Sequence, residues 1–351
     1  MQGDIIPYST TTLLGVQTRV IQPFSFWLQF FTQTLNFDTE TISFEKVQIN
    51  NRGLAPFVAP NVQAAYNRLD GYDAAQFKPG YIKEKDVVDI NMPFFRQAGE
   101  TPVSGSLSPN QRRAAIIAKL TQDHVTRIHN RFEWMASQAI QHAAIEISGE
   151  RYTKSVLSFG RDPNLTLTTD WTEGKGGNGF NDIKRMRVLS NRLCGSEIRI
   201  NIFGADAWDA FYKLHKEELK DLLDTRYRGS DTNITKLIDG FDGIEYVGDI
   251  VGLNGAGRIK VFINTMVYTD EKGATQYFQD QGSVVGIDPN AFSGVRCFGA
   301  IRDGRADYKS MEIFPKNWVN GEDPYEELIM HQSAPLMVPL APNATYYIKA
   351  V

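Results

Sequence analysis

The chain has 351 residues, of which 42% are hydrophobic and 22% are charged, and its 37 basic and 41 acidic side chains give a formal net charge of −4 at pH 7. This length and composition are those of an ordinary globular protein with one to three domains. The slightly acidic balance disfavours a dedicated, sequence-specific nucleic-acid-binding protein, although it leaves room for loose packing of nucleic acid against a local basic face.

The two cysteines, Cys194 and Cys297, indicate a reducing compartment, because two thiols cannot form a structural zinc site and nothing resembles a secreted disulfide framework. The N-terminus has no basic segment followed by an apolar one, so we predict no signal peptide. The most apolar run, residues 24–31, is far shorter than the ~20 residues that span a bilayer. We therefore expect a soluble protein with no membrane partner.

The first 104 residues contain few signals for helices. Residues 24–31 are rich in aromatic side chains and must pack against the core of the same subunit or against a neighbour. Alternating apolar residues from Ile42 predict a strand that ends before a turn at residues 50–53. Residues 59–104 are helix-poor and long for a loop in a compact domain. This segment is either a flexible insertion or an arm or hairpin that becomes ordered on another subunit.

The clearest element is an amphipathic helix over residues 109–147. Ser108 and Gln111 form a capping box, and Gly149 supplies the predicted end. At ~1.5 Å per residue the helix would be roughly 60 Å long, which suggests a spine against which several layers lie. The predicted apolar face holds Ala114, Ile117, Ala118, Thr121, Val125, Ile128, Phe132, Met135, Ala136, Ala139 and Ala143. The predicted polar face holds Arg112, Arg113, Lys119, Asp123, Arg127, Asn130, Arg131, Gln138 and Gln141.

Residues 181–287 alternate between helical and strand patterns, which indicates an inserted α/β domain. We predict helices over residues 182–193 and 206–224, the second capped by Asp206, and strands over residues 197–203, near 244–247 and near 259–263. Two further strands are predicted before this domain, over residues 151–159 and 165–171. From residue 288 onward the chain is strand-like or irregular.

The turn from Gly174 to Gly179 fits the G-x-G-x-x-G pattern of dinucleotide-binding proteins and lies between a predicted strand and a predicted helix. Three details argue against that function. The preceding strand is half polar, the third glycine precedes the predicted helix start, and Asp206, the acidic candidate for a ribose, comes about seven residues late. A plain turn is favoured, and a soluble α/β nucleotide-binding enzyme that uses this turn is the alternative.

The sequence gives only weak signals for a metal site or a catalytic site. His129 and Glu133 share a helix face at the i,i+4 spacing of two metal ligands, but no third ligand is assigned, so a local polar pair is the simpler interpretation. No nucleophile elbow, Walker A loop or zinc-protease motif is present in the sequence. We therefore predict no catalytic, metal-binding or cofactor-binding residues.

The long helix also carries a basic stripe, formed by Lys119, Arg127 and Arg131. A solvated helix face is the simple interpretation. The alternative is weak, salt-sensitive contact with phosphate groups, without readout of bases.

Several motifs occur in a fixed order along the chain: Phe77-Lys-Pro-Gly-Tyr-Ile-Lys83, then Leu222-Leu-Asp-Thr-Arg226, then Phe314-Pro-Lys-Asn-Trp318, Gly321-Glu-Asp-Pro324 and Gln332-Ser-Ala-Pro-Leu-Met337. In this order and spacing they resemble the lambda-type major capsid proteins of tailed bacteriophages, the capsid protein E family. The resemblance is strongest from about Arg296 to Pro339, whereas residues 1–45 and 230–290 match loosely.

The resemblance implies an α+β subunit with the Hong Kong 97-type capsid fold. In that fold residues 1–45 would form an N-terminal arm and residues 46–104 an extended hairpin, the E-loop. Residues 105–182 and 288–351 would form a peripheral domain built on the spine helix, and residues 183–287 an axial domain.

The resemblance also implies the function of a major capsid protein, or major head protein, and not of an enzyme. Copies of the chain would self-assemble, without covalent cross-links, into the hexamers and pentamers of an icosahedral head that encloses double-stranded DNA. The implied partners are further copies of the chain, a scaffolding protein, a portal, optionally a decoration protein, and packaged DNA through non-specific contacts. No cofactor is implied, and the protein would be assembled in the host cytoplasm and reside in the virion.

Particular residues follow from the matched motifs. The resemblance implies inter-subunit contacts for Phe77, Pro79, Gly80, Tyr81, Lys83, Phe314, Lys316, Asn317, Trp318, Asp323 and Pro324. The stripe of Lys119, Arg127 and Arg131 is the candidate DNA-facing surface.

Overall fold

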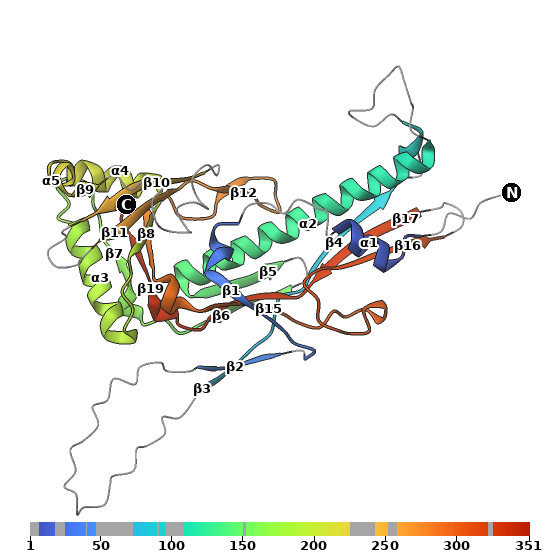
Figure 1. Cartoon of the computed structure of the whole chain (residues 1–351), viewed down its shortest axis with the longest axis horizontal. Helices are drawn as coiled ribbons and strands as arrows, with labels where there is room; N and C mark the ends of the chain where they lie inside the picture. Colours follow the sequence, from blue (N-terminus) through green and yellow to red (C-terminus); the bar gives the residue numbers. More distant parts are fainter. Residues whose placement is uncertain are drawn as a thin grey trace, which may run out of the picture.

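The computed structural model describes residues 7–17, 25–39, 41–46, 73–89, 91–95, 108–149, 152–224, 243–251, 258–321 and 326–351. One long helix, α2, runs along the elongated body, with a large sheet and its helices at one end and a small sheet beside the helix toward the other (Figure 1). A β-hairpin, β2 (Ile42–Lys46) with β3 (Asp73–Phe77), extends away from the body. Helices and sheets thus occupy separate parts of an α+β subunit.

Helix α2 spans Pro109–His142 and begins as the sequence predicts. Gln111 N donates to Ser108 Oγ at 3.3 Å, and Ser108 N donates to Gln111 Oε1 at 2.8 Å, which completes the capping box. The predicted end at residue 147 is wrong. Ala143 adopts a left-handed conformation with φ of 47°, and the chain continues as a strand, β5 (Ala144–Gly149).

The early end of α2 has a local cause. Ile145 is fully buried whereas Glu146 is exposed, so burial alternates with the period of a strand instead of a helix. β5 pairs antiparallel with β6 (Tyr152–Ser158), and this hairpin satisfies the backbone groups that a longer helix would have used. The predicted polar face is also partly wrong, because Gln141 is buried and donates to Phe278 O at 2.8 Å.

The aromatic segment near residue 30 packs into the core of its own subunit. Phe26, Trp27 and Phe31 are each 0% exposed. They lie in or beside a 3-10 helix, η1 (Trp27–Phe30), which is followed by β1 (Phe31–Asn36). β1 pairs in parallel with β15 (Gly294–Phe298), which in turn pairs with β18 (Pro335–Pro339), and α2 packs on this sheet. The sequence left open whether these aromatic residues pack in their own subunit or against a neighbour, and the structure shows that they pack in their own subunit.

A buried carboxylate on α2 holds this segment in place. Glu133 Oε1 accepts from the amides of Phe26 at 2.7 Å and Trp27 at 2.6 Å, and Oε2 accepts from Leu28 N at 3.0 Å. These amides stand at the start of η1 and have no partners within the helix, so the carboxylate acts as its cap. Burial raises the pKa of Glu133 to about 7, against the opposing effect of the three amides.

The large sheet has seven strands in the order β7–β19–β14–β8–β11–β10–β9. Their bounds are β7 Thr166–Thr168, β8 Ile200–Phe203, β9 Leu223–Asp224, β10 Ile244–Ile250, β11 Ile259–Asn264, β14 Ser283–Ile287 and β19 Thr345–Lys349. Ile202 and Val285 join the core that includes α2, whereas Phe203 and Val284 join a second core with the helices of this region. Because β7 and β19 belong to this sheet, it contains strands from both of the domains that the sequence suggested.

The second predicted helix of this region is shorter than expected. α4 spans Ala205–Leu214, α5 spans Lys216–Leu222, and His215 between them leaves the helical conformation. Gly204 occupies the cap position, so the predicted cap by Asp206 is wrong; Asp206 lies in the first turn instead. Phe211 on α4 and Leu219 on α5 are both buried in the second core.

The glycine-rich turn leads directly into α3 (Gly179–Cys194), which Asn178 caps. Gly179 is therefore inside the helix, contrary to the sequence prediction. A Cβ at Gly179 would lie 2.4 Å from the Phe211 ring, so this glycine permits close packing of α3 on α4. The strand before the turn, β7, is a three-residue strand at the edge of the sheet, which differs from the buried central strand of a dinucleotide-binding fold.

The small sheet joins three strands from distant parts of the sequence in the order β16–β17–β4. They are β4 (Ile82–Val88), β16 (Phe314–Asn320) and β17 (Glu326–Ser333). Helix α1 (Thr10–Gln17) packs on β16 and buries Leu13 against Ile116 and Ile329. The remaining elements are η2 Met92–Phe94, η3 Pro163–Leu165, the hairpin β12 Val267–Thr269 and β13 Thr275–Tyr277, α7 Pro289–Phe292, η4 Gly304–Ala306 and η5 Pro342–Ala344. Over the described ranges no helix is long and apolar enough to cross a membrane.

We predict that Glu133→Ala destabilises the protein by roughly 3 kcal/mol, because three buried amides lose their acceptor. Denaturant unfolding of the unassembled protein measures the loss. Hydrogen exchange of peptides covering residues 26–31 should speed up more than that of β14. The matched control is Asp123→Ala, an exposed acid on the same helix, expected within about 0.5 kcal/mol of the wild type. Equal stability of the two variants would contradict the proposed anchoring.

Candidate functional site

The motif that starts at Phe314 forms β16 (Phe314–Asn320), which is buried at its start and exposed at its end. Phe314 is 1% exposed and Asn317 is 2% exposed, whereas Lys316 and Trp318 are half-buried. β16 pairs antiparallel with β17, whose other edge pairs with β4. The strand at the base of the predicted E-loop and the motif that starts at Phe314 therefore share one sheet beside α2.

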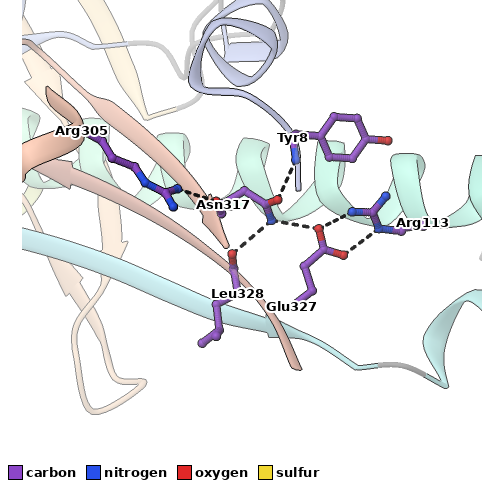
Figure 2. Close-up of polar contacts among 6 residues, drawn as sticks. All are labelled: Tyr8, Arg113, Arg305, Asn317, Glu327 and Leu328. Atoms are coloured by element: carbon purple, nitrogen blue, oxygen red, sulfur yellow. Dashed lines mark hydrogen bonds and ion pairs between the residues drawn. The ribbon is translucent and has the colours of Figure 1, made fainter. Parts of the chain in front are cut away.

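Asn317 connects four segments of the subunit (Figure 2). Its Oδ1 accepts from Tyr8 N at 2.8 Å, and its Nδ2 donates to Glu327 Oε1 at 3.0 Å and to Leu328 O at 3.1 Å. Its backbone oxygen accepts from Arg305 Nη1 at 3.0 Å. The buried side chain of Asn317 thus joins Tyr8 to β17, and its backbone oxygen holds the loop before β16.

Glu327 receives a bidentate ion pair from α2. Arg113 Nε donates to Oε2 at 2.7 Å and Nη2 donates to Oε1 at 2.6 Å, while only 2% of the Glu327 side chain is exposed. The Arg113 guanidinium also lies over the ring of Tyr8, 5.0 Å from its centroid. Arg113 was predicted on the solvated face of the helix, and the structure corrects this. We call Tyr8, Arg113, Asn317 and Glu327 the Asn317 junction.

A second group of contacts fixes Tyr81 beside the same sheet. The Tyr81 hydroxyl donates to Gln332 Oε1 at 2.8 Å and accepts from Arg302 N at 3.0 Å. Asp303 Oδ2 accepts from Lys316 Nζ at 2.6 Å and from Gln332 Nε2 at 3.2 Å. Burial alone would raise the pKa of Asp303, but these hydrogen bonds outweigh it and lower that pKa. Tyr81 and Lys316, which come from two distant motifs, are thereby linked within one subunit.

Two buried histidines form a third contact between α2 and the sheet. His124 Nδ1 lies 2.9 Å from His331 Nδ1, and His124 Nε2 lies 2.9 Å from Asp86 Oδ2. The contact between the two rings requires one Nδ1 to donate and the other to accept. His331 Nε2 remains buried without a hydrogen-bond partner. Burial, together with the neighbouring His124, lowers the pKa of His331 to about 3.

The other residues of the E-loop motif make contacts within the subunit as well. The Phe77 ring lies 5.4 Å from that of Phe159, and Pro79 is buried against Gly299. Gly80 faces Ile147 on β5, and the Lys83 ammonium lies 5.3 Å from the centroid of the Tyr81 ring. Lys83 itself is exposed. Asp323 and Pro324 lie outside the described residues.

The basic stripe on α2 is partly neutralised by acids from other elements. Arg127 Nη1 lies 3.2 Å from Glu84 Oε2 on β4, and Arg131 Nη2 lies 2.5 Å from Glu271 Oε1 in the β12–β13 hairpin. Lys119 is exposed. These pairs link the spine helix to β4 and to the β12–β13 hairpin.

The candidate metal pair separates in the structure. Glu133 binds the amides of η1, while the His129 ring lies 5.4 Å from that of Phe132 and its pKa is lowered to about 4 by burial and by Arg296. Within the part of the chain that the structure describes, no group of three or more His, Cys, Asp or Glu residues could hold a metal ion.

Sequence reasoning found Asn317 but missed its partners. Tyr8, Arg113 and Glu327 lie far apart in the sequence, and only their common sheet brings them together. One signal was available: Glu327 directly precedes a run of apolar residues, so a strand packed on α2 would carry an acid that needs a cation from the helix.

Comparisons with known proteins agree on one family. The family model described as phage major capsid protein E matches residues 9–350. The major capsid protein of Enterobacteria phage P21 is 27% identical over 342 residues, which cover 94% of this chain and 95% of that protein. The major capsid protein of Escherichia phage lambda is 26% identical over 298 residues, which cover 83% of each chain.

One solved structure shows the same fold. It is a prophage protein of Escherichia coli CFT073 that is described as a capsid protein, and it superposes with a TM-score of 0.75 at 22% identity. The match covers 99% of this chain and 100% of that one. The expected capsid fold is confirmed by this likeness.

We predict that Asn317→Asp destabilises the subunit by about 3 kcal/mol or more, although the two side chains have nearly the same shape. The carboxylate cannot donate to Glu327 or Leu328 O, and it adds a second buried negative charge beside Glu327. Denaturant unfolding measures the loss. Asn320→Asp, at the exposed end of the same strand, is the control and should be nearly neutral. A neutral Asn317→Asp would show that the junction contributes little.

We predict that His331→Asn flattens the acid dependence of stability. Below pH 6.5 the unfolded chain binds a proton at residue 331, whereas the folded chain binds none until about pH 3, so stability falls as the pH falls through this range. Removing the group should reduce the slope by up to about 1.4 kcal/mol per pH unit near pH 4–5, measured by denaturant unfolding.

The choice of asparagine keeps the contact while removing the titration, because its amide group can either donate to His124 Nδ1 or accept from it. His331→Gln should show the same flattening but lower stability at every pH, since its amide extends beyond that position. An unchanged slope in both variants would contradict the neutral, buried state of His331.

Proposed function

Because this chain belongs to the phage major capsid protein E family, we propose that its copies assemble into the hexamers and pentamers of an icosahedral head around double-stranded DNA. The chain is a major capsid protein of a tailed phage, a structural component of the virion capsid and not an enzyme. The observation that carries the proposal is the family match over residues 9–350, which leaves almost no part of the chain for another activity.

We propose the domain division of the sequence analysis with one change. Residues 1–45 are the arm, 46–104 the E-loop, 105–182 and 288–351 the peripheral domain, and 183–287 the axial domain. The change concerns β7 and β19, which we assign to the axial domain because they are hydrogen-bonded into its sheet. The support is the pairing itself, since a strand held on a neighbouring strand moves with it.

The residues of the matched motifs divide into two kinds under this proposal. Phe314, Pro79 and Asn317 are buried and position the strands, so their contribution to subunit contacts is indirect. The exposed Lys83 and the half-buried Phe77, Gly80, Tyr81, Lys316 and Trp318 are the members that a neighbouring subunit can reach. Asp323 and Pro324 remain candidates for such contacts from the resemblance alone.

We propose Lys119, Arg127 and Arg131 as the DNA-facing group. Lys119 and Arg127 are exposed, which supports the proposal, but Glu84 and Glu271 reduce the charge that the two arginines present. Contact with phosphates would therefore be weak and strongly dependent on salt. A scaffolding protein, a portal and a decoration protein are further partners that we propose from the family alone.

Size-exclusion chromatography and negative-stain electron microscopy of the purified protein test the main proposal. The expected species are capsomers or closed shells, with a melting temperature that does not respond to nucleotides. A monomer or small oligomer that is stabilised by a dinucleotide would overturn it in favour of the enzyme alternative.

We predict that shortening the β2–β3 hairpin prevents shell closure without unfolding the subunit. Replacing residues 47–72 with Asn-Gly joins Lys46 to Asp73, which already pair across the two strands, through a favoured two-residue turn. The thermal midpoint should stay near that of the wild type while closed particles disappear in electron micrographs.

A glycine-serine linker of the natural length is the control for this variant, because it keeps the reach of the hairpin and removes its side chains. It should also fail to close shells if the side chains carry the contact. Normal particles from the Asn-Gly variant would refute the assignment of this segment to inter-subunit contacts.

A further inference from the structure

The guanidinium of Arg161 lies where the C-terminal end of the spine helix meets the seven-stranded sheet. On the helix side, Nη1 donates to Ile140 O at 3.2 Å and Nη2 donates to Gln141 O at 2.8 Å. On the sheet side, Nη1 donates to Thr345 Oγ1 at 3.3 Å and Nη2 donates to Thr166 Oγ1 at 3.0 Å. One side chain thus joins the last turn of α2 to the first residues of β19 and β7.

The acceptors on the helix side explain why a cation is stable in this place. α2 ends at His142, so the carbonyl groups of its last turn have no partner within the helix. They also form the negative end of the helix dipole, which favours a positive charge. Burial lowers the pKa of Arg161 to about 10, so the guanidinium remains charged at neutral pH. Arg161 therefore caps the spine helix at its C-terminal end.

The backbone on either side of Arg161 is held by the same two parts of the subunit. Phe159 N donates to Ala143 O at 2.8 Å, directly after the end of α2. Asp162 N donates to Asn343 Oδ1 at 2.8 Å, and Asn343 lies in η5, the short helix that precedes β19. The guanidinium is thus placed by the helix end and by the sheet together, and it is not a free side chain that reaches across a gap.

The helix and the sheet also share an apolar core, but that core constrains their angle less. Ile140 on α2 belongs to one cluster with Ile202 and Val285 on the sheet. Apolar contacts have no directional requirement, whereas hydrogen bonds weaken steeply when their angles are distorted. The planar guanidinium presents its donors in a rigid fork. Its acceptors on the helix and on the sheet are therefore satisfied together over only a narrow range of relative orientations.

The length of α2 turns a small change of this angle into a large displacement. Its 34 residues give about 50 Å at ~1.5 Å per residue. A tilt of about 5° at the C-terminal end would move the other end, which packs beside β4 and β17, by about 4 Å (Figure 1). Close-packed contacts do not tolerate a displacement of that size. In a shell built from copies of this chain, the angle therefore decides how successive copies fit, and this step rests on the proposed function.

We propose that Arg161 is a positioning residue for shell geometry, which fixes the angle between α2 and the seven-stranded sheet and thereby determines the curvature and diameter of the assembled shell. Lysine cannot take its place, because a single ammonium group cannot span the four acceptors that the planar fork reaches. The residue acts within one subunit, through the shape that it imposes on that subunit.

The first test is Arg161→Lys, which keeps the positive charge but cannot bridge the helix and the sheet. We expect a roughly twofold wider spread of shell diameters in cryo-electron micrographs, because the angle within the subunit is no longer fixed. The matched control is Arg187→Lys, since Arg187 is buried and donates to Ile198 O at 2.6 Å, which joins α3 to the segment before β8. Both variants should lower the thermal midpoint, and only Arg161→Lys should broaden the diameters.

The second test removes the acceptors on the sheet and leaves the cap of α2 in place. The double variant Thr166→Val with Thr345→Val loses both hydroxyl groups while keeping nearly the same side-chain shape. It should broaden the shell diameters in the same way as Arg161→Lys. This variant decides the question if Arg161→Lys forms no particles.

A purely structural role for Arg161 would change stability and not particle size. Shells of wild-type diameter and uniformity from both Arg161→Lys and the double threonine variant would therefore overturn the proposal. Equal broadening in Arg187→Lys would overturn it as well, because the effect would then follow from lost stability alone. If the wild type itself forms no shells, the proposed function fails; if its shells are uniform and those of the variants match them, only this inference fails.

Discussion

A carboxylate that is almost fully removed from water sets the most demanding constraint on this subunit. Glu327 is 2% exposed, and a buried charge is tolerated only when donors surround it. The guanidinium of Arg113 and the amide of Asn317 meet that requirement, one from the spine helix and one from the neighbouring strand. Any shift of β17 by one residue would turn the carboxylate to the other face of the sheet, away from both donors. The junction thereby fixes the register of the sheet on the helix.

The same register also positions β4 and the N-terminal segment relative to α2. β4 pairs with β17, so the base of the E-loop is placed by the strand that Glu327 anchors. Tyr8 donates to Asn317, which ties the beginning of the arm to the same point, and Glu133 ties the arm again farther along α2. The proposed arm and E-loop are thus attached to one helix at separate polar contacts. Such contacts favour one geometry more than they add stability.

Local chemistry made part of this fold predictable. The capping box at Ser108 marked the start of α2, and apolar periodicity marked its core face near Ile128. The end of α2 was missed because residues 144–147 are acceptable in a helix and become a strand only through pairing with β6. The short helix α1 was not predicted, since its stability comes from packing Leu13 on the small sheet rather than from propensity.

The candidate site was harder to predict than the fold, for a physical reason. The motif around Asn317 identified the strand, but its partners Tyr8 and Arg113 are separated from it by hundreds of residues, and side-chain pairing over such distances leaves no periodic trace. The Gly179 prediction failed similarly, because the aromatic ring that needs the glycine comes from α4. Sequence patterns report a residue's own segment, whereas a buried polar contact depends on two segments at once.

Buried polar groups and exposed apolar groups place different geometric requirements on this subunit. The Asn317 junction and the Glu133 anchor bury charge and amide groups inside one subunit, where a missing partner costs several kcal/mol, so they enforce a single shape. Phe94 and Phe95, by contrast, are exposed apolar groups, which have no directional requirement. Because the directional contacts of the junction and the anchor lie inside the subunit, they favour one shape that can be repeated in every copy.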